Sequence, residues 1–211
     1  MILKQWYVVM DSTQVRAKPV GVVRMGEKLV FWRDSAGKVF CLRDKCAHRG
    51  VQLSKGKMVG GRLQCPFHGM EYDATGRVRL IPANGKNTPV PEQFTVHSYA
   101  THEARQFIWI WWGENLPENL QPPQFFKDID DSLSYSRTYD YWNAHYSRVI
   151  ENQLDAAHLP FVHYNTIGRG NRTIVDGPFF QWLDDNMFYV FVHNRVDDGT
   201  VPLRPEQMPT P

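Results

Sequence analysis

The stretch Cys46-Ala47-His48-Arg49-Gly50 has a similar counterpart further along the chain, Cys65-Pro66-Phe67-His68-Gly69. Sixteen residues separate His48 from Cys65. Each motif offers one thiolate and one imidazole beside a turn-forming Gly or Pro. A single buried cysteine or a single histidine in a turn is common and implies nothing. Four such side chains on two short loops predict a metal centre held by Cys46, His48, Cys65 and His68.

Two kinds of metal centre suit two sulfurs and two nitrogens. A structural zinc ion is one, although such sites usually take both thiolates from one knuckle and both imidazoles from another. Here each loop supplies one of each. A two-iron cluster fits this mixture better, because one iron can take both cysteines and the other both histidines. Neutral imidazoles in place of thiolates remove negative charge and raise the reduction potential.

At these residues the sequence resembles the Rieske [2Fe–2S] family, over roughly residues 1–115. The Rieske proteins of cytochrome bc complexes carry an extra cysteine in each loop, and these two form a disulfide. The matching positions here are Val51 and Phe67, so the likeness is to the oxygenase and ferredoxin branch. The resemblance implies a [2Fe–2S] cluster as cofactor. Cys41 lies in the apolar run 39–42 and is expected to be a buried bystander.

Composition narrows the class of protein. The chain has 211 residues, of which 42% are hydrophobic and 13% aromatic, enough to bury a core. A formal net charge of +2 does not indicate nucleic acid or an anionic membrane as partner. No signal peptide or run of membrane-spanning length is evident, and three cysteines do not make a disulfide framework. These features predict a soluble, cytoplasmic protein.

The chain changes character near its middle, and the fold class expected is α+β. Short strands separated by turns, and a strongly aromatic last strand over 106–113, predict an all-β domain over residues 1–115. After a Pro-rich connector, residues 116–211 are expected to open a second domain. The strands expected in the first domain are 6–10, 28–33, 39–43 and 62–65, with a hairpin at 72–78. The elements expected in the second domain are a strand over 134–143, a helix over 146–158 and a hairpin over 178–196.

A second constellation lies in the second half, in Glu151-Asn152-Gln-Leu-Asp155-Ala-Ala-His158-Leu-Pro160-Phe-Val-His163. Asn152, Asp155 and His158 are three apart and would form one polar stripe on a helix. Two histidines five apart diverge on a continuous helix, but Pro160 can end the helix and start the next turn. Both imidazoles can then converge on one metal. The simpler alternative is an amphipathic helix whose polar face includes a histidine with its hydrogen bonds made inside the protein.

This pattern resembles the mononuclear-iron motif of Rieske non-heme iron oxygenases, in which two histidines and a distant carboxylate form a facial triad. Carried over, His158 and His163 are ligands of a mononuclear Fe(II). Asp155 is the carboxylate that links the iron site to a Rieske histidine of a neighbouring subunit, and Asn152 lies close to the iron. The third ligand is usually an Asp far downstream on a late helix. None of the late acids has that context, and none is nominated: Asp176, Asp184, Asp185, Asp197, Asp198 and Glu206.

The resemblance therefore implies the first part of an oxygenase α subunit, a Rieske domain followed by the opening of a helix-grip catalytic domain. A reductase, directly or through a ferredoxin, would feed the cluster, and the iron would activate O₂ to hydroxylate or oxidatively demethylate an aromatic or similar small molecule. The family implies a homotrimer, and a chain without the third ligand is expected to be inactive. The alternative is an electron-transfer or redox-regulatory protein without oxygenase activity. Three bound irons per chain would favour the first, and two the second. The aromatic residues of the late hairpin are expected to be sheet core rather than substrate contacts: Phe179, Phe180, Trp182, Phe188 and Tyr189.

Overall fold

The structure, a computed structural model, describes residues 2–113, 116–121, 132–134, 136, 138–184 and 187–207. The chain divides into two compact units, Met1–Leu133 and Ser134–Pro211, and each is described by itself. The domain boundary expected between residues 115 and 116 adjoins residues outside the described ranges and stays a prediction.

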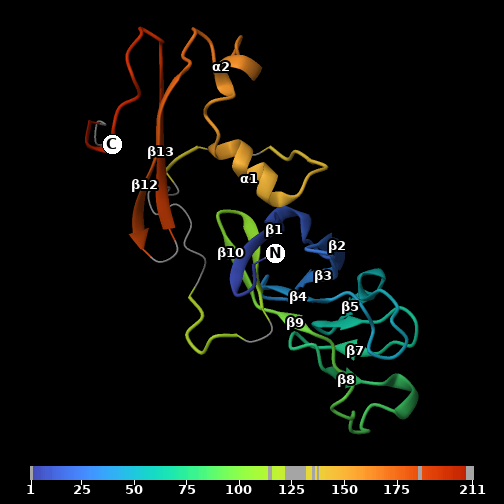
Figure 1. Cartoon of the computed structure of the whole chain (residues 1–211). Helices are drawn as coiled ribbons and strands as arrows, with labels where there is room; N and C mark the ends of the chain where they lie inside the picture. The colour runs from blue at the N-terminus through green and yellow to red at the C-terminus, as the bar shows by residue number, and fades with distance from the viewer. Residues whose placement is uncertain are drawn as a thin grey trace. The chain divides into compact units, whose positions relative to one another are not determined.

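The first unit is built from three antiparallel sheets (Figure 1). Their orders are β1-β11-β10, β2-β3-β4-β9 and β5-β6-β7-β8. The α+β fold class is confirmed, and every strand expected in this half is present. Four strands were not anticipated: β2, β5, β9 and β10. The bounds are β1 Gln5–Asp11, β2 Val20–Arg24, β3 Glu27–Arg33, β4 Val39–Arg43, β5 Lys57–Val59, β6 Arg62–Gln64, β7 Glu71–Tyr72, β8 Val78–Leu80, β9 Ser98–Tyr99, β10 Thr101–Ala104 and β11 Phe107–Trp112, with single 3-10 turns at Ser12–Gln14, Leu53–Lys55 and Pro82–Asn84.

Strand β3 separates two hydrophobic cores. Because side chains alternate along a strand, Val30 and Trp32 enter one core while Leu29 and Phe31 enter the other. The first core also contains the two cysteines of the paired motifs, Cys46 and Cys65. The second core contains Cys41, so this cysteine lies in a different core from Cys46 and Cys65.

The second unit contains two short helices and one long hairpin. These are α1 Tyr146–Leu154, α2 Leu159–Val162, β12 Ile174–Asp184 and β13 Met187–Arg195, followed by a 3-10 turn at Pro205–Gln207. Strands β12 and β13 pair antiparallel, as expected, although turn residues 185–186 lie outside the described ranges. The carboxylate of Asp176 is fully buried and accepts hydrogen bonds from Arg195 Nε at 2.9 Å and Leu203 N at 2.7 Å. This pair holds the segment after β13 against the hairpin.

Three expectations for the second unit are wrong. The described residues of 134–143 form no strand, since alternation alone supplies no partner for strand hydrogen bonds. The helix ends at Leu154 rather than His158, for a reason given below. The hairpin aromatics are not core, because a two-stranded ribbon alone cannot cover them. The exposed fractions are Phe180 61%, Trp182 67%, Phe188 41% and Tyr189 44%, and only Phe179 is partly buried.

Candidate metal centres

The two ligand loops of the first unit share one backbone pattern. In the first loop, Cys46 N donates to Val51 O at 2.8 Å and Gly50 N donates to Cys46 O at 2.9 Å. In the second, the same two bonds recur at 2.8 Å and 3.1 Å, from Cys65 N to Met70 O and from Gly69 N to Cys65 O. Both glycines have positive φ, 70° at Gly50 and 73° at Gly69, which other residues rarely adopt. The first loop lies between β4 and β5, which belong to different sheets, and the second joins β6 to β7 within one sheet.

The two sulfurs are buried at the inner side of these loops. Cys46 is 4% exposed and Cys65 is 2% exposed. Burial raises the pKa of the Cys65 thiol, and the adjacent Cys46 adds to this, while hydrogen bonds from the backbone N–H groups of Phe67 and His68 act in the opposite direction. Two thiols this close resist ionising together in a dry environment. A bound cation removes that conflict, so the pair suits a metal.

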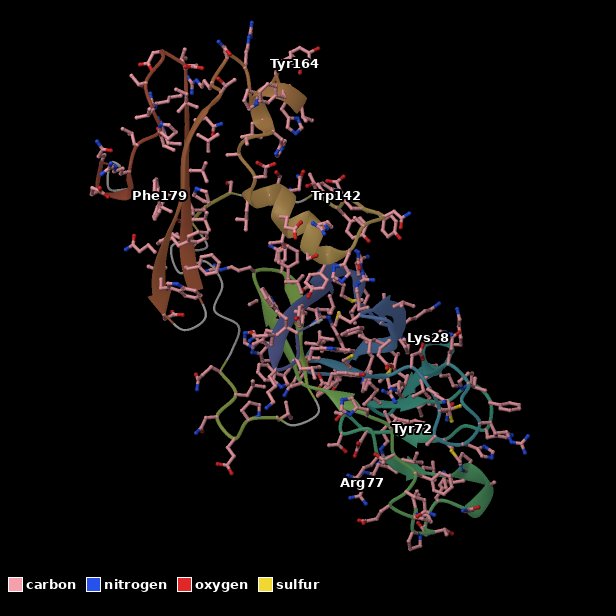
Figure 2. The ribbon with its side chains drawn as sticks, in the orientation of Figure 1. Lys28, Tyr72, Arg77, Trp142, Tyr164 and Phe179 are labelled. Carbon is pink, nitrogen blue, oxygen red and sulfur yellow. The ribbon has the colours of Figure 1, made fainter. Side chains whose placement is uncertain are left out.

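Tyr72 of β7 completes the sulfur side. Its hydroxyl donates to Cys46 Sγ at 3.1 Å and accepts from Ala47 N at 2.9 Å (Figure 2). The ring is fully buried. Burial raises the pKa of Tyr72 far above its usual value, so the hydroxyl stays a donor at any physiological pH.

The two imidazoles lie on the outer side of the loops. His48 Nδ1 and His68 Nδ1 are 3.1 Å apart, and both side chains are exposed. Two nitrogens bound to one metal at about 2.1 Å in tetrahedral geometry are separated by roughly 3.4 Å. The observed separation therefore fits two imidazoles on the same ion. Phe67, 56% exposed, packs against His68 with ring centroids 4.0 Å apart and ring planes tilted by 37°.

The donors are arranged as two plus two rather than around one point. Among the described residues, no group of three His, Cys, Asp or Glu side chains could hold a single ion. A tetrahedral zinc site needs all four donors at one centre. A two-iron cluster needs the two sulfurs at one iron and the two nitrogens at the other. The buried pair of sulfurs and the outer pair of nitrogens thus fit the cluster.

The second candidate centre lies at the two ends of the short helix α2. His158 caps the N-terminus of α2, His163 caps its C-terminus, and Pro160 lies in its first turn, as the sequence indicated. The two rings are 5.4 Å apart between centroids and cross at 64°. Imidazoles that share one ion have centroids at most about 6.4 Å apart, given metal–nitrogen bonds near 2.1 Å. Both histidines can therefore reach one metal.

Asp155 explains why α1 stops early. Its backbone is extended at the end of the helix, with φ −85° and ψ 110°, and its carboxylate accepts from Ala157 N at 2.8 Å. This local bond replaces the helical one and turns the chain before His158. Asn152, Asp155 and His158 therefore do not form the continuous helical stripe that their spacing suggested. Asn152 remains on α1, exposed and without a side-chain hydrogen bond among the described residues.

The turn brings Asp155 next to the first histidine instead. A carboxylate oxygen lies 3.3 Å from His158 Nδ1. That nitrogen is buried, and no described residue gives it a hydrogen bond of good geometry. The bond from Ala157 N–H, with a smaller contribution from His158, lowers the pKa of Asp155, which keeps it ionised. Metal-binding histidines commonly direct their second nitrogen at such a carboxylate. Asp155 is placed to orient His158 in this way.

Two residues that sequence reasoning missed hold this turn in place. Asn194 of β13 donates from Nδ2 to Ala156 O at 3.1 Å, which ties the loop before His158 to the hairpin. Gly168 is buried, and its N–H donates to His163 O at 3.0 Å. A Cβ at this position would overlap the carbonyl oxygen of Leu159. Tyr72 was missed in the same way, because a strand residue gives no signal that it reaches a distant loop.

No third ligand joins His158 and His163 within the part of the chain that the structure describes. The late acids that are described have other roles or positions. Asp176 bonds Arg195 and Leu203, and Asp198 accepts from Thr200 N at 3.1 Å and lies 3.3 Å from Arg195 Nη1. Asp197 accepts from Gly199 N at 3.0 Å, Glu206 is exposed, Asp184 ends β12, and Asp185 lies outside the described residues.

Comparison with known proteins agrees with the division of the chain into two units. The family model for the Rieske [2Fe–2S] domain matches residues 5–100, and the model for the vanillate O-demethylase oxygenase C-terminal domain matches residues 142–205. Chlorophyllide a oxygenase of Chlamydomonas reinhardtii is 38% identical over 69% of this chain, and methylxanthine N1-demethylase NdmA of Pseudomonas putida is 32% identical over 87%. The chain spans only 22% and 51% of these relatives.

A solved structure extends the comparison to a metal-bound relative. Dicamba monooxygenase with non-heme iron and dicamba superposes with a TM-score of 0.64 at 31% identity, covering 72% of this chain and 46% of that one. A Rieske domain implies a [2Fe–2S] cluster, and the relative binds non-heme iron. Fold, paired ligand loops and a second histidine pair define a protein of the two-centre Rieske type. The chain belongs to the Rieske non-heme iron oxygenase family.

None of the helices that the structure describes is long and apolar enough to cross a membrane. The cytoplasmic location expected from the sequence stays a prediction.

Proposed function

We propose that this chain is part of the oxygenase component of a multicomponent Rieske oxygenase. In this proposal Cys46, Cys65, His48 and His68 hold a [2Fe–2S] cluster, and His158 and His163 hold a mononuclear Fe(II). The reaction is O₂-dependent hydroxylation or oxidative demethylation of an aromatic or similar small molecule. The observation that carries it is the presence of two separate histidine pairs, each at metal-sharing distance, one of them beside two buried thiols.

The two centres would supply different chemistry when bound: the cluster would store one electron at a time, and the Fe(II) would activate O₂ beside the substrate. The chain's own residues set the conditions for each. Burial keeps water from the sulfurs. The Tyr72 hydroxyl donates to Cys46 Sγ, and the backbone N–H groups of Phe67 and His68 donate toward Cys65. These hydrogen-bond donors would favour the more negative, reduced state of a cluster held by the thiolates.

At the second centre the proposed role of Asp155 is positioning. Its carboxylate orients His158, so that the other ring nitrogen is free for iron. By the family resemblance, the same carboxylate also contacts a Rieske histidine of a neighbouring subunit in a homotrimer. Electrons would then cross between subunits, and Asn152 would lie near the iron. An external reductase, alone or with a ferredoxin, is the proposed source of electrons.

The relatives support a small, mostly planar substrate. Their names refer to chlorophyllide a, dicamba and a methylxanthine, three chemically different molecules. This diversity favours a broad proposal for the present chain, an aromatic or similar ring compound with a methyl group or an oxidisable C–H bond.

One observation favours a second candidate, a Rieske-type electron-transfer or redox-regulatory protein. Among the described residues His158 and His163 lack a third ligand, and two neutral imidazoles bind Fe(II) only weakly. The chain would then use only its first centre.

Anaerobic titration with Fe(II) separates the two candidates. After the cluster is assembled, the oxygenase proposal expects a third iron per chain that is lost in His158→Ala and kept in His145→Ala, a control histidine before α1. Binding that saturates at two irons in the unchanged chain, with no effect of His158→Ala, would contradict it and favour the carrier.

A further inference from the structure

The two ligand loops share their internal hydrogen bonds but differ in how they are closed at the base. The second loop leads directly into the ladder of β6 and β7, where Gln64 pairs with Glu71 on either side of residues 65–70. Such a ladder fixes both ends of a loop relative to each other. The first loop has no ladder at its base, because β4 and β5 belong to different sheets. The closure of residues 44–56 therefore depends on other contacts.

The side chain of Asp44 supplies a closure of this kind. One carboxylate oxygen accepts from Ser54 N at 2.7 Å, and the other accepts from Ser54 Oγ at 2.6 Å. The backbone N–H of Asp44 donates to Lys28 O at 2.7 Å, which fixes this end of the loop to β3. We call Asp44 and Ser54 the loop clamp. It joins two points ten residues apart, on either side of Cys46 and His48.

The loop clamp is buried and closely surrounded. Asp44 is only 3% exposed. Gly21 of the edge strand β2 lies against the clamp, since a Cβ at this position would be 2.5 Å from Ser54 Oγ and 3.2 Å from Asp44 Oδ2. Leu53, the residue before Ser54, is fully buried in the core that contains the two ligand cysteines. A buried carboxyl group without its partners is costly, so the clamp favours one geometry of the loop.

The loop clamp reaches the ligands through a short stretch of backbone. Cys46 follows Asp44 by two residues, and its N–H donates to Val51 O at 2.8 Å. Val51 in turn precedes Ser54 by three residues, so both arms of the loop lead into the clamp. Separation of Asp44 from Ser54 would open the loop at its base. The Cys46 sulfur and the His48 imidazole would then lose their fixed positions relative to the second loop.

We propose that Asp44 is a positioning residue for the [2Fe–2S] cluster. By its two bonds to Ser54 it holds the first ligand loop, and with it Cys46 and His48, at the spacing that the cluster requires. This rests on the proposed function, since it requires that the two loops bind a cluster. The second loop obtains the same support from the β6–β7 ladder. The effect comes from the two hydrogen bonds and not from a charge on Asp44.

The test compares four variants of the cluster-loaded chain. Asp44→Ala removes both bonds of the loop clamp. Gly21→Ala leaves Asp44 and Ser54 unchanged but forces them to shift. Asp44→Asn keeps the shape, and its amide can accept from Ser54 N and donate to Ser54 Oγ. Asp11→Ala is the matched control, because Asp11 at the end of β1 makes the same two bonds with Thr13, at 2.9 Å to N and 2.7 Å to Oγ1.

Two measurements report on the cluster rather than on the fold. The first is the rate at which the visible absorbance of the cluster bleaches in excess iron chelator. The second is the width of the EPR lines of the reduced cluster, which grows when the ligands adopt a range of positions. Thermal melting of the cluster-free chain records the stability of the fold separately. A merely structural role of Asp44 would lower the melting temperature in Asp44→Ala and leave the EPR lines unchanged.

Asp44→Ala and Gly21→Ala are expected to lose the cluster about tenfold or more faster than the unchanged chain, with broader EPR lines. Asp44→Asn should stay within about threefold of the unchanged chain, because it keeps both bonds, and Asp11→Ala within about twofold. Cluster loss from Asp44→Ala no faster than from Asp11→Ala would overturn the inference. Loss from Asp44→Asn as fast as from Asp44→Ala would overturn it too, since charge rather than hydrogen bonding would then be the cause.

Two further outcomes complete the test. If Asp44→Ala does not fold, Gly21→Ala and Ser54→Ala decide, and normal cluster retention with unchanged EPR lines in both overturns the inference. An unchanged chain that assembles no iron–sulfur cluster, judged by its visible and EPR spectra, overturns the proposed function and the inference together. A chain that assembles the cluster, and holds it equally firmly in Asp44→Ala, overturns the inference alone.

Discussion

The Tyr72 hydroxyl donates a hydrogen bond to Cys46 Sγ at a distance of 3.1 Å, from a ring that is completely buried. Such a bond stabilises a sulfur more as its negative charge grows, which occurs when the cluster is reduced. Tyr72→Phe should therefore lower the reduction potential. A bond to a charged group is worth about 1.5–3 kcal/mol, so for a one-electron couple a drop of at most roughly 65–130 mV is expected.

Spectroelectrochemical titration measures this potential, and Tyr99→Phe is the matched control. Tyr99 lies in the second core with Cys41, away from the ligand cysteines. An unchanged potential in Tyr72→Phe would mean that the hydroxyl does not touch the sulfur in the loaded protein.

Cys41 offers a test of the ligand assignment. It is 1% exposed, and burial raises the pKa of its thiol well above the usual value, so it stays a neutral core residue. Cys41→Ser should leave the iron and sulfide content unchanged and lower stability by about 1–3 kcal/mol, because a hydroxyl is buried in an apolar core. Metal analysis and thermal melting check both, with Cys46→Ser as the variant that loses the cluster. Loss of iron in Cys41→Ser would show that a ligand has been misassigned.

Gly168 should control the second metal site without touching the first. An added methyl group would overlap the Leu159 carbonyl and push apart the turn that carries His158 and His163. We expect Gly168→Ala to weaken binding of the third iron at least tenfold, in an anaerobic Fe(II) titration. The Rieske EPR signal serves as the internal control and should not change. If this variant binds the third iron with full affinity, His158 and His163 are not its ligands.

Asp155→Asn should separate metal binding from catalysis. The amide keeps the shape of the side chain but lacks the charge that lies next to His158 and to which the proposed function gives a role between subunits. Both metals should be retained, while product formation falls about 10–100-fold. Turnover is measured with a reductase, in the longest chain that the gene encodes. If a monomer of the unchanged chain or of Asp155→Asn keeps full coupled turnover, this contradicts the proposed role of Asp155 in electron transfer between subunits.

The extent of sequence-based prediction differs between the two centres. The ligand loops could be predicted because the donors, their spacing and the glycine turns are all local. The contact of Tyr72 with Cys46 could not, because it depends on how β7 packs under the first loop. At the second centre Pro160 was interpreted correctly, since its effect on a helix is local.

The wrong expectations share one cause, which is competition that a linear pattern does not reveal. Ala156 and Ala157 favour helix, yet the Asp155 carboxylate takes the Ala157 N–H and ends α1 at Leu154. Segment 134–143 alternates but has no pairing partner among the described strands. The exposed Trp182 and Phe188 show the same limit, because burial depends on elements that a hairpin by itself does not supply.

Metal and sulfide analysis of the purified chain, combined with Mössbauer spectra of ⁵⁷Fe-enriched protein, tests the two-centre proposal most directly. We predict two irons and two sulfides per chain, in two inequivalent sites of which one is bound by nitrogen, and a third iron that binds only when Fe(II) is added in excess. Weak binding of that third iron follows from two imidazoles without a described carboxylate. A colourless protein with one zinc per chain and no sulfide would contradict the assignment of Cys46, His48, Cys65 and His68 as cluster ligands.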